Sequence, residues 1–395
     1  MRRAIRQMRL PEHRHKRSLQ AQPENDKMAE VSSMEFDYEK ISIPGAEKKS
    51  VYRCTPMQFC FVGPRGVGKS SLLASMYHEL EEKRHIDNFY VDISTGTGRR
   101  TQVRLSNAKK EMLSMLTESA PYATAALGLG LRGDADEMSV YEFVGRSTVQ
   151  DTSLAARLLR REQKEFRFPF RFIDMPGGWY RAERIDDETA ARVKNTLEAS
   201  SVSFLAIDTP ALMESPALCM EYNRVDTIKA WYEASIDRLS EQQHTVVLVL
   251  SRCERYCSDK RAIYDRLRST YATLIRKLKN AGINVYATYV QTLGGMEFET
   301  YETVQRGNLS LKVARFIKTG EYAPENCATP LLLALRHGLL RSLEQLHSKK
   351  ENNRLVAWCA ALGWNNVDTA LQAAYGLIEV LDERIQTGQP SYEQL

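Results

Sequence analysis

The stretch Gly63-Pro-Arg-Gly-Val-Gly-Lys-Ser70 fits the pattern G-x-x-x-x-G-K-[ST] at every fixed position. It follows a short apolar run, residues 58–62, and precedes residues 70–82, whose apolar residues recur at the spacing of one helical face. Glycines let successive backbone N–H groups turn towards a polyphosphate, and the helix that follows adds the positive end of its dipole. The sequence therefore predicts a phosphate-binding loop between a buried strand and a helix.

The side chains of this loop predict its contacts. We expect Lys69 to reach the β- and γ-phosphates of a nucleotide and the Ser70 hydroxyl to coordinate Mg²⁺. The predicted phosphate-contacting residues are Gly63, Arg65, Gly66, Val67, Gly68, Lys69, Ser70 and Ser71. The alternative is a glycine-rich turn that matches by accident, and the strand–loop–helix context argues against it.

A second motif, Asp174-Met-Pro-Gly177, follows a predicted strand at residues 165–173. An Asp at a strand tip can hold Mg²⁺ through a water, and the backbone N–H of a Gly three residues later can meet a γ-phosphate. Lys69, Asp174 and Gly177 are therefore the predicted catalytic residues, with Ser70 and Asp174 as metal ligands. A turn Asp and a turn Gly without such a role are the alternative.

Strands alternate with helices along the chain. The further predicted strands are residues 89–93, 139–144, 202–207, 245–250 and 283–290, and the further helices are 106–116, 187–199, 221–239 and 259–280. This order predicts an α/β fold, a mostly parallel sheet with helices on both faces. Residues 120–136, rich in Gly and Ala, predict a mobile loop. After Pro330 the sequence predicts helices only, at residues 331–346, 355–361 and 367–385.

Three regions follow from composition and pattern. Residues 1–50 predict a basic, disordered tail, residues 51–347 a nucleotide-binding domain with an insert at about 94–138, and residues 348–395 a helical C-terminal extension. Residues 1–20 carry a net charge of +6, which leaves −1 for the rest of a chain of net charge +5. A nearly neutral folded part argues against a general nucleic-acid binder, and no DNA or RNA specificity is expected.

The basic tail has other interpretations. It could be an anion-binding arm, a targeting leader, or an upstream extension of a reading frame that starts at Met28 or Met34. The longest clean apolar run, residues 246–250, is far shorter than a membrane span. Seven scattered cysteines predict a reducing, cytoplasmic location, and Cys253 and Cys257 lack the companions of a zinc site.

In the order of its motifs the chain resembles the translation-factor-related class of P-loop GTPases. Residues 202–208 resemble the strand after the switch helix, and residues 246–254 the strand that carries the base-reading [NT]-K-x-D motif. Tyr289-Val-Gln-Thr-Leu-Gly-Gly295 lies where the last guanine-contacting loop falls. The long insert and this ending look like the GTPase domains of bacterial conflict and double-GTPase systems.

The resemblance covers about residues 55–345 and implies GTP or GDP with Mg²⁺ as ligands. It implies base contacts by Arg252, Glu254, Thr292 and Leu293. The chain departs from the motif, because Glu254 stands in place of Asp and Arg252 in place of Lys. A carboxylate at residue 254 could still accept hydrogen bonds from guanine, and Arg252 could stack its guanidinium or its stem on the base.

A second departure concerns catalysis. Gly178 stands where many relatives carry a water-orienting Gln, which implies slow hydrolysis, another residue, or a group supplied by a partner. Arg65 and Arg181 could stabilise charge, or could be a loop-tip and a solvated residue. The spacing selects no threonine for the first switch, and Thr124 is the nearest candidate.

Three functions remain open at this point. The first is a GTP-binding, slowly hydrolysing switch that acts on a protein partner, with a homodimer left open. The second, favoured by Gly178, is a nucleotide-binding scaffold without turnover. The third, favoured by Arg252 and Glu254, is an ATPase.

Overall fold

The computed structural model describes most of the chain from residue 51 onward. The described residues are 51–53, 56–82, 89–93, 98–117, 122–126, 137–150, 163–180, 186–306, 309–352, 375–379, 381–382, 385 and 392–395. The expected tail, residues 1–50, lies outside them.

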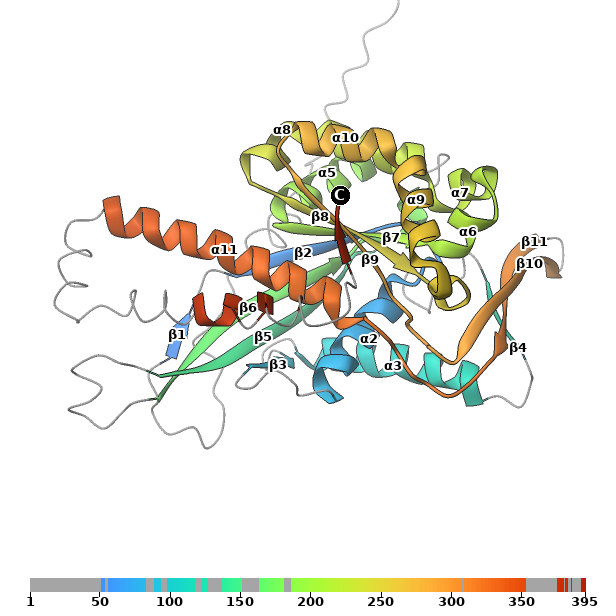
Figure 1. Cartoon of the computed structure of the whole chain (residues 1–395), viewed down its shortest axis with the longest axis horizontal. Helices are drawn as coiled ribbons and strands as arrows, with labels where there is room; N and C mark the ends of the chain where they lie inside the picture. Colours follow the sequence, from blue (N-terminus) through green and yellow to red (C-terminus); the bar gives the residue numbers. More distant parts are fainter. Residues whose placement is uncertain are drawn as a thin grey trace, which may run out of the picture. The chain divides into compact units, whose positions relative to one another are not determined.

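A nine-stranded sheet forms the centre of the described part (Figure 1). Its strands are β1 (Val51–Arg53), β2 (Met57–Val62), β3 (Phe89–Ile93), β5 (Ser139–Gln150), β6 (Gln163–Asp174), β7 (Val202–Asp208), β8 (Thr245–Ser251), β9 (Asn284–Tyr289) and β12 (Tyr392–Gln394). The order is β12-β9-β8-β7-β2-β6-β5-β3, with β1 beside β6. The pairs within β9-β8-β7-β2-β6 are all parallel, and every residue of β7 and β8 is buried, as expected of strands covered on both faces. The predicted α/β fold with a mostly parallel sheet is confirmed.

Helices cover both faces of this sheet. One face carries α2 (Lys69–Glu82), α3 (Gly98–Thr117) and α11 (Ala328–Asn352). The other carries α5 (Asp187–Ala199), α8 (Val225–Glu241), α9 (Lys260–Thr270) and α10 (Ala272–Asn280), with α6 (Thr209–Glu214) and α7 (Pro216–Asn223) after β7. Each face therefore has its own hydrophobic core.

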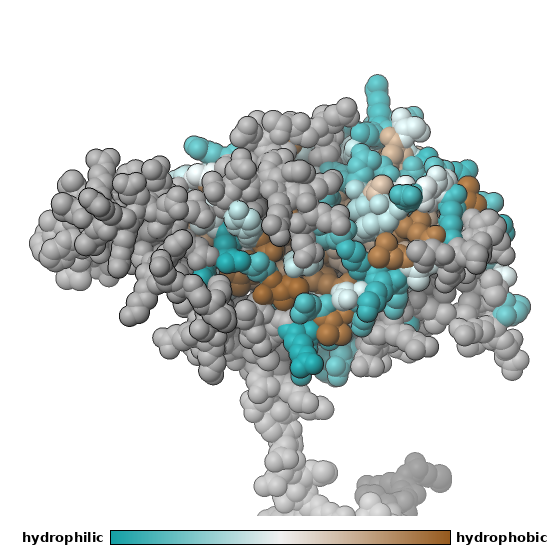
Figure 2. Space-filling view, turned by 90° about the horizontal axis from the view of Figure 1, so that it is seen from below, coloured by the Kyte–Doolittle hydropathy of each residue, from teal (hydrophilic) through white to brown (hydrophobic). Residues whose placement is uncertain are grey.

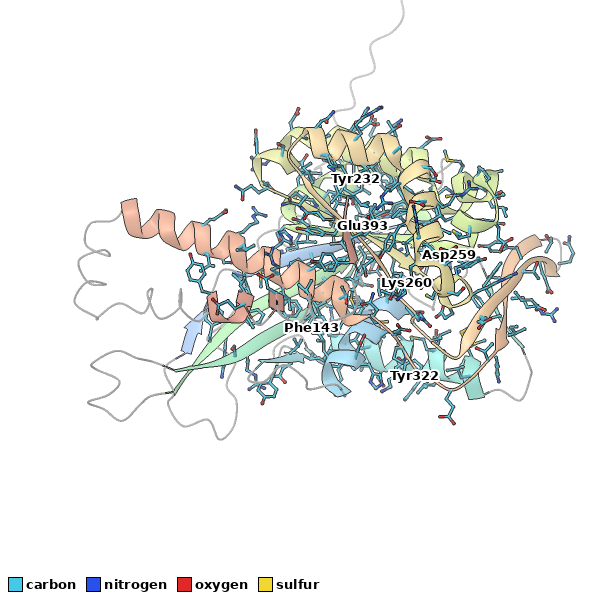
Figure 3. All side chains as sticks on the ribbon, in the orientation of Figure 1. Phe143, Tyr232, Asp259, Lys260, Tyr322 and Glu393 are labelled. Carbon is cyan, nitrogen blue, oxygen red and sulfur yellow. The ribbon has the colours of Figure 1, made fainter. Side chains whose placement is uncertain are left out.

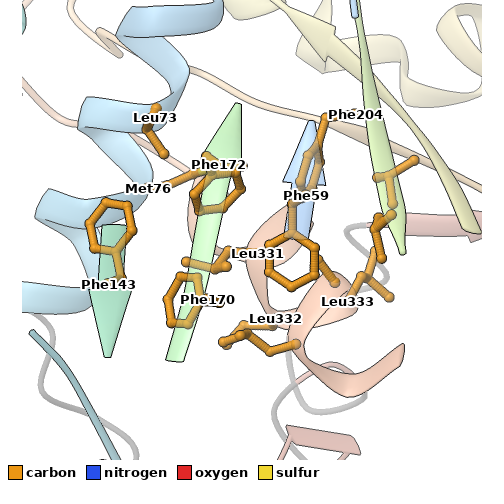
Figure 4. Packing of buried hydrophobic residues seen from close by; sticks show 14 of the residues in the cluster. Phe59, Leu73, Met76, Phe143, Phe170, Phe172, Phe204, Leu331, Leu332 and Leu333 are labelled. Atoms are coloured by element: carbon orange, nitrogen blue, oxygen red, sulfur yellow. The ribbon is translucent and has the colours of Figure 1, made fainter. Parts of the chain in front are cut away.

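Phenylalanines from neighbouring strands fill the core beneath α2 and α11 (Figure 4). Phe170 and Phe172 of β6 are both buried, and the Phe172 ring centroid lies 5.4 Å from that of Phe59. Phe143 of β5 stacks on Phe170 at 5.4 Å between ring centroids. Leu331 of α11 packs on the same cluster, so that the last long helix covers the strands that lead to the phosphate-binding loop.

Two predicted helices are each broken into a pair. The helix predicted at 221–239 spans parts of α7 and α8, which meet at Arg224 with φ +50°. The helix predicted at 259–280 is α9 followed by α10, with Tyr271 between them at φ −99° and ψ 12°. Asp259 begins α9 by accepting a hydrogen bond from the Ala262 amide at 2.9 Å (Figure 3). Both halves of each pair bury one side on the same core, so the apolar spacing does not reveal the break.

A second sheet of three antiparallel strands was not predicted. It consists of β10 (Met296–Arg306), β11 (Leu309–Lys318) and β4 (Tyr122–Ala126). The predicted mobile loop at 120–136 is therefore wrong at 122–126, and residues 120–121 and 127–136 lie outside the described part. Only pairing with the distant β11 makes β4 a strand. The hairpin had a signal, since its strands are separated by the two residues Gly307 and Asn308.

The end of the chain also differs from expectation. The prediction of helices only after Pro330 is wrong at β12, which pairs antiparallel with β9. Residues 355–361 and 367–374 lie outside the described residues, whereas residues 375–379, 381–382 and 385 are helical. Leu381 is buried in the cluster that holds α11, and α11 continues through residues 347 and 348, where the predicted domain boundary falls. The division into domains stays a prediction.

Large hydrophobic side chains exposed among the described residues come from separate elements. They are Tyr90, Val103, Met220, Ile317 and Tyr375. On the face shown in Figure 2, hydrophobic areas are separated by hydrophilic residues. No helix in the described part of the chain is long and apolar enough to cross a membrane.

Two histidines with lowered pKa values predict acid sensitivity. Desolvation lowers the pKa of His244, whose ring nitrogens lie 2.8 Å from the Ser200 carbonyl and the Ser203 hydroxyl, from 6.5 to about 4. Burial lowers the pKa of His337 to about 4 as well. The unfolded chain binds protons below about pH 6.5 and the folded chain only near pH 4, so stability falls as the pH drops through this window. We expect the lowered pKa of each histidine to reduce the free energy of unfolding by on the order of 2 kcal/mol between pH 7.5 and pH 5.

Urea unfolding of the wild type and of His244→Gln at both pH values checks this expectation. Buried carboxyl groups with raised pKa, such as Glu254, act in the opposite direction in both proteins, so the difference between the two proteins isolates His244. The variant should lose less stability between pH 7.5 and pH 5 than the wild type. An equal loss in both proteins would contradict the assignment.

Candidate functional site

The phosphate-binding loop joins β2 to α2 as predicted. Gly63, Gly66 and Gly68 have φ angles of +147°, +83° and +94°, which favour glycine. At Gly63 a Cβ atom would also lie 2.9 Å from the Ala206 carbonyl oxygen of β7. The Leu72 amide donates to the Gly68 carbonyl at 2.8 Å and closes the first turn of the helix. The backbone of the loop therefore favours glycine at both positions that the motif specifies, Gly63 and Gly68, and at Gly66 as well.

Lys69 lies inside the loop with 7% of its side chain exposed. Its Nζ donates to the carbonyl oxygens of Gly63 at 2.8 Å and Pro64 at 3.3 Å, and lies 3.9 Å from Asp174 Oδ1. Burial lowers the pKa of Lys69, and the neighbouring Asp174 carboxylate opposes that shift. The ammonium group is thus held against the carbonyl oxygens of the loop, where the negative charge of a bound phosphate would stabilise its charged form.

Ser70 and Asp174 are brought together from distant parts of the sequence. The Ser70 hydroxyl donates to Asp174 Oδ2 at 2.9 Å, while Oδ1 is buried without a hydrogen-bond partner. Burial raises the pKa of Asp174, and Lys69 and Ser70 lower it. A hydroxyl and a carboxylate with an unused oxygen are the donors that Mg²⁺ prefers. No cluster of three or more His, Cys, Asp or Glu that could hold a metal occurs among the described residues, so a magnesium ion here would take further ligands from phosphate and water.

The segment after Asp174 packs directly on the phosphate-binding loop. Gly177 begins the short helix η2 (Gly177–Tyr180), and a Cβ atom on it would lie 2.3 Å from the backbone N and Cα of Arg65. Trp179 and Tyr180 are buried, and the Tyr180 ring centroid lies 5.9 Å from Lys69 Nζ and 4.6 Å from that of Trp231 in α8. The contact between Gly177 and the loop therefore leaves no room for a larger residue.

The residues at the end of β8 hold the phosphate-binding loop from its other side. Ser251 Oγ donates to the carbonyl oxygens of Val67 at 2.8 Å and Ile207 at 3.0 Å. Arg252, at φ +57°, donates to the Gly66 carbonyl and, at 3.1 Å, to Asp208 Oδ2. Its guanidinium also lies 5.6 Å from the Phe316 ring centroid. Because the guanidinium has these partners, any stacking of Arg252 on a base falls to the stem of the side chain.

Glu254 lies against the loop that follows β9. Its Oε1 accepts a hydrogen bond from the Leu293 amide at 3.4 Å. Burial raises the pKa of Glu254 to about 6, and backbone amides of Leu293 and Gly294 oppose the rise. Thr292 is buried, and its carbonyl accepts a hydrogen bond from Ser75 of α2 at 3.1 Å. The fold thus gathers Glu254, Thr292 and Leu293 at the edge of the sheet that bears the phosphate-binding loop.

Other residues named from the sequence lie elsewhere. Thr124 belongs to β4, where it pairs with Arg315 of β11, and Arg181 lies outside the described residues. The Sγ atoms of Cys253 and Cys257 are 3.1 Å apart, and all five cysteines in the described ranges are free thiols.

Three residues near the loop were missed from the sequence. They are Asp208, Tyr301 and Phe316. Asp208 had a signal, because it directly follows the strand predicted at residues 202–207. The carboxyl ends of parallel strands meet at one edge of a sheet, where Asp174 also lies. Tyr301 and Phe316 had no sequence signal, since only the folded β10–β11 hairpin brings them close to Asp208 and Arg252.

Comparison with known proteins adds only distant likenesses. No family model matches the chain, and no curated protein matches it in sequence. Among solved structures, the S. cerevisiae Ski7 GTPase-like domain bound to GTP is 15% identical, with a TM-score of 0.31 over 61% of this chain and 43% of that chain. The same domain with GDP and inorganic phosphate is 14% identical, with a TM-score of 0.30 over 61% and 44%.

A third similar structure is the complex of SsGBP with GDP, at 11% identity and a TM-score of 0.22 over 68% of this chain and 52% of that one. The chain thus spans about half or less of each of these structures, and likenesses this low assign no activity. The mostly parallel sheet, the loop after β2 and Asp174 at the end of β6 by themselves show an α/β fold with a phosphate-binding loop.

Proposed function

We propose that this chain binds GTP and GDP together with Mg²⁺, hydrolyses GTP slowly, and acts as a switch on a protein partner. One observation carries the proposal. The phosphate-binding loop holds Lys69 at its mouth, with Ser70 hydrogen-bonded to Asp174 from a separate strand. When bound, Mg²⁺ would be held by Ser70 and Asp174 and would neutralise charge on the phosphates.

The base site favours guanine in this proposal. Guanine presents two N–H donors on its Watson–Crick edge, whereas adenine presents an acceptor nitrogen at the corresponding position. A carboxylate at Glu254 would accept hydrogen bonds from guanine and repel the adenine acceptor. Its place beside the Leu293 amide supports this role, with Arg252, Thr292 and Leu293 as neighbours of the base.

Slow turnover follows from the segment after Asp174. Gly178 offers no side chain to orient a water molecule, and Trp179 and Tyr180 point into the core. Backbone groups or a group from a partner must then orient the water molecule that attacks the γ-phosphate and releases phosphate and GDP. A nucleotide-binding scaffold without turnover is the second candidate function, and the same buried residues favour it.

The switch would lie where Gly177 meets Arg65. A γ-phosphate arriving beside Lys69 would offer the Gly177 amide an acceptor, and its loss on hydrolysis would withdraw that acceptor. We propose that the chain belongs to the translation-factor-related class of P-loop GTPases, near those of bacterial conflict and double-GTPase systems. Support comes from the order of the Gly63–Ser70, Asp174–Gly177, Ser251–Glu254 and Gln291–Gly295 segments along the chain.

Titration with fluorescent GTP and ATP analogues, with and without Mg²⁺, tests the proposal, together with phosphate release over time. The proposal expects Mg²⁺-dependent preference for GTP and slow phosphate release. Preference for ATP would contradict the guanine assignment and favour an ATPase. Tight GTP binding without any phosphate release would favour the scaffold.

Ser70→Ala should separate magnesium binding from nucleotide binding. The change removes a hydroxyl ligand but no charge, so we expect GTP affinity in Mg²⁺ to fall about tenfold. The affinity measured in EDTA should change little. Ser269→Ala, on the exposed side of α9, is the matched control and should behave as the wild type. Equal losses with and without Mg²⁺ would remove Ser70 from the metal site.

A further inference from the structure

The β7 strand ends between the phosphate-binding loop and β8. β7 pairs in parallel with β2, from which the loop departs, and with β8 on its other side. Asp208, the last residue of β7, is in register with Ser251 at the end of β8. This arrangement places the Asp208 carboxylate next to the loop and next to Arg252.

Asp208 and Arg252 form a shielded ion pair. Their side chains are only 3% and 14% exposed, and Arg252 Nη1 donates to Asp208 Oδ2 at 3.1 Å. Burial raises the pKa of Asp208, and Arg252 is the largest of the groups that oppose the rise. With Nη1 fixed by Asp208, the planar guanidinium directs Nη2 to the Gly66 carbonyl of the phosphate-binding loop.

Residues of the second sheet pack against the Asp208–Arg252 ion pair. The Phe316 ring of β11 lies over the Arg252 guanidinium, 5.6 Å away at its centroid. Tyr301 of β10 lies close enough to Asp208 to lower the pKa of that carboxyl. The Tyr301 ring stacks on Tyr222 of α7, with 5.0 Å between centroids. Arg252 therefore has little freedom to turn away from Gly66.

The consequence for the loop follows from peptide geometry. In a trans peptide the carbonyl and the next residue's N–H point in opposite directions. Arg252 holds the Gly66 carbonyl and Ser251 holds the Val67 carbonyl. The N–H groups of Val67 and Gly68 are thus turned away from β8. These are the amides that a phosphate-binding loop needs to point at its ligand.

We infer that Asp208 is a positioning residue of the nucleotide site, which aligns Arg252 so that it holds the Gly66 peptide in the orientation that receives phosphate. The inference rests on the proposed nucleotide-binding function. It adds a residue that makes no contact with the ligand and acts only through Arg252. The same contacts make the β10–β11 hairpin part of the support of the site.

A double-mutant cycle tests this inference. Asp208→Asn should speed dissociation of a fluorescent GDP analogue about tenfold, since it replaces the carboxylate that pairs with the Arg252 guanidinium by a neutral amide, which accepts a weaker hydrogen bond. In an Arg252→Met background the same change should have no further effect on dissociation. Asp208→Asn should lower the melting temperature of the wild type, yet raise that of Arg252→Met, where it removes an unpaired buried carboxylate. A residue with a merely structural role would not make its effect on dissociation depend on Arg252.

Two further variants complete the test. Asp265→Asn removes an ion-paired carboxylate on the exposed surface of α9 and should leave dissociation unchanged. Arg252→Lys keeps the charge but offers one ammonium in place of a fork, and should speed dissociation even if Asp208→Asn does not fold.

The outcomes separate this inference from the function on which it rests. Wild-type protein that binds no guanine nucleotide overturns the proposed function and the inference with it. Wild-type protein that binds, with unchanged dissociation in Asp208→Asn or in Arg252→Lys, overturns the inference alone. Additive effects of Asp208→Asn and Arg252→Met on dissociation also overturn it.

Discussion

Lys69→Ala is expected to weaken GTP binding by about a hundredfold or more while the protein remains folded. The ammonium group is the positive charge at the mouth of the phosphate-binding loop, and charge-assisted hydrogen bonds to phosphate are among the stronger polar contacts. Burial disfavours the charged form of Lys69, so its removal also relieves a desolvation cost. Titration with a fluorescent GTP analogue measures the loss, and circular dichroism checks the fold.

Lys277→Ala is the matched control for this change. Lys277 lies on the surface of α10, where it pairs with Glu233. It should bind nucleotide as the wild type does. GTP affinity unchanged in Lys69→Ala would refute the phosphate-binding role of the loop, and an unfolded Lys69→Ala protein would show that the residue is structural.

Gly177→Ala is expected to uncouple nucleotide binding from the segment that we propose senses the γ-phosphate. The new Cβ would lie 2.3 Å from backbone atoms of Arg65, and backbone cannot turn aside as a flexible side chain could. The segment must therefore move off the loop. We expect phosphate release to fall at least tenfold, because the Gly177 amide no longer reaches the γ-phosphate, while GDP affinity changes little.

Phosphate release and the fluorescence of Trp179, two residues away, read out this change. In the wild type we expect the fluorescence to differ between GTP and GDP complexes, and in Gly177→Ala we expect the difference to vanish. Gly376→Ala is the control, since a Cβ there meets nothing within 4 Å. Normal phosphate release in Gly177→Ala would show that the segment does not sense the γ-phosphate.

Short-range pattern predicted the centre of the fold well. The strands that became β2, β7, β8 and β9 are largely apolar runs, because both of their faces are buried under helices, whereas β6 alternates phenylalanines with polar residues. The helices that cover them show apolar spacing on one side for the same reason. The motif also predicted where Lys69 and Ser70 lie, because it fixes their positions at the start of the helix that follows the loop.

The sequence pattern did not predict the elements whose structure depends on segments far away in the sequence. β4 and β12 are strands because of the strands beside them, and segments of five and three residues are too short for a readable period. The longer β10–β11 hairpin had its signal in the turn at residues 307 and 308. The breaks at Arg224 and Tyr271 were invisible because one residue out of helical conformation does not disturb the apolar spacing on either side.

The sequence by itself determined the phosphate-binding loop and the α/β order of the main sheet, because both depend on residues that are neighbours along the chain. Tertiary structure alone decided that Ser70 bonds to Asp174, that Gly177 rests on Arg65, and that Asp208 aligns Arg252. Each of these contacts joins residues that end or follow different strands of the sheet. The order of strands in a sheet is set by the packing of whole elements, which no local pattern records.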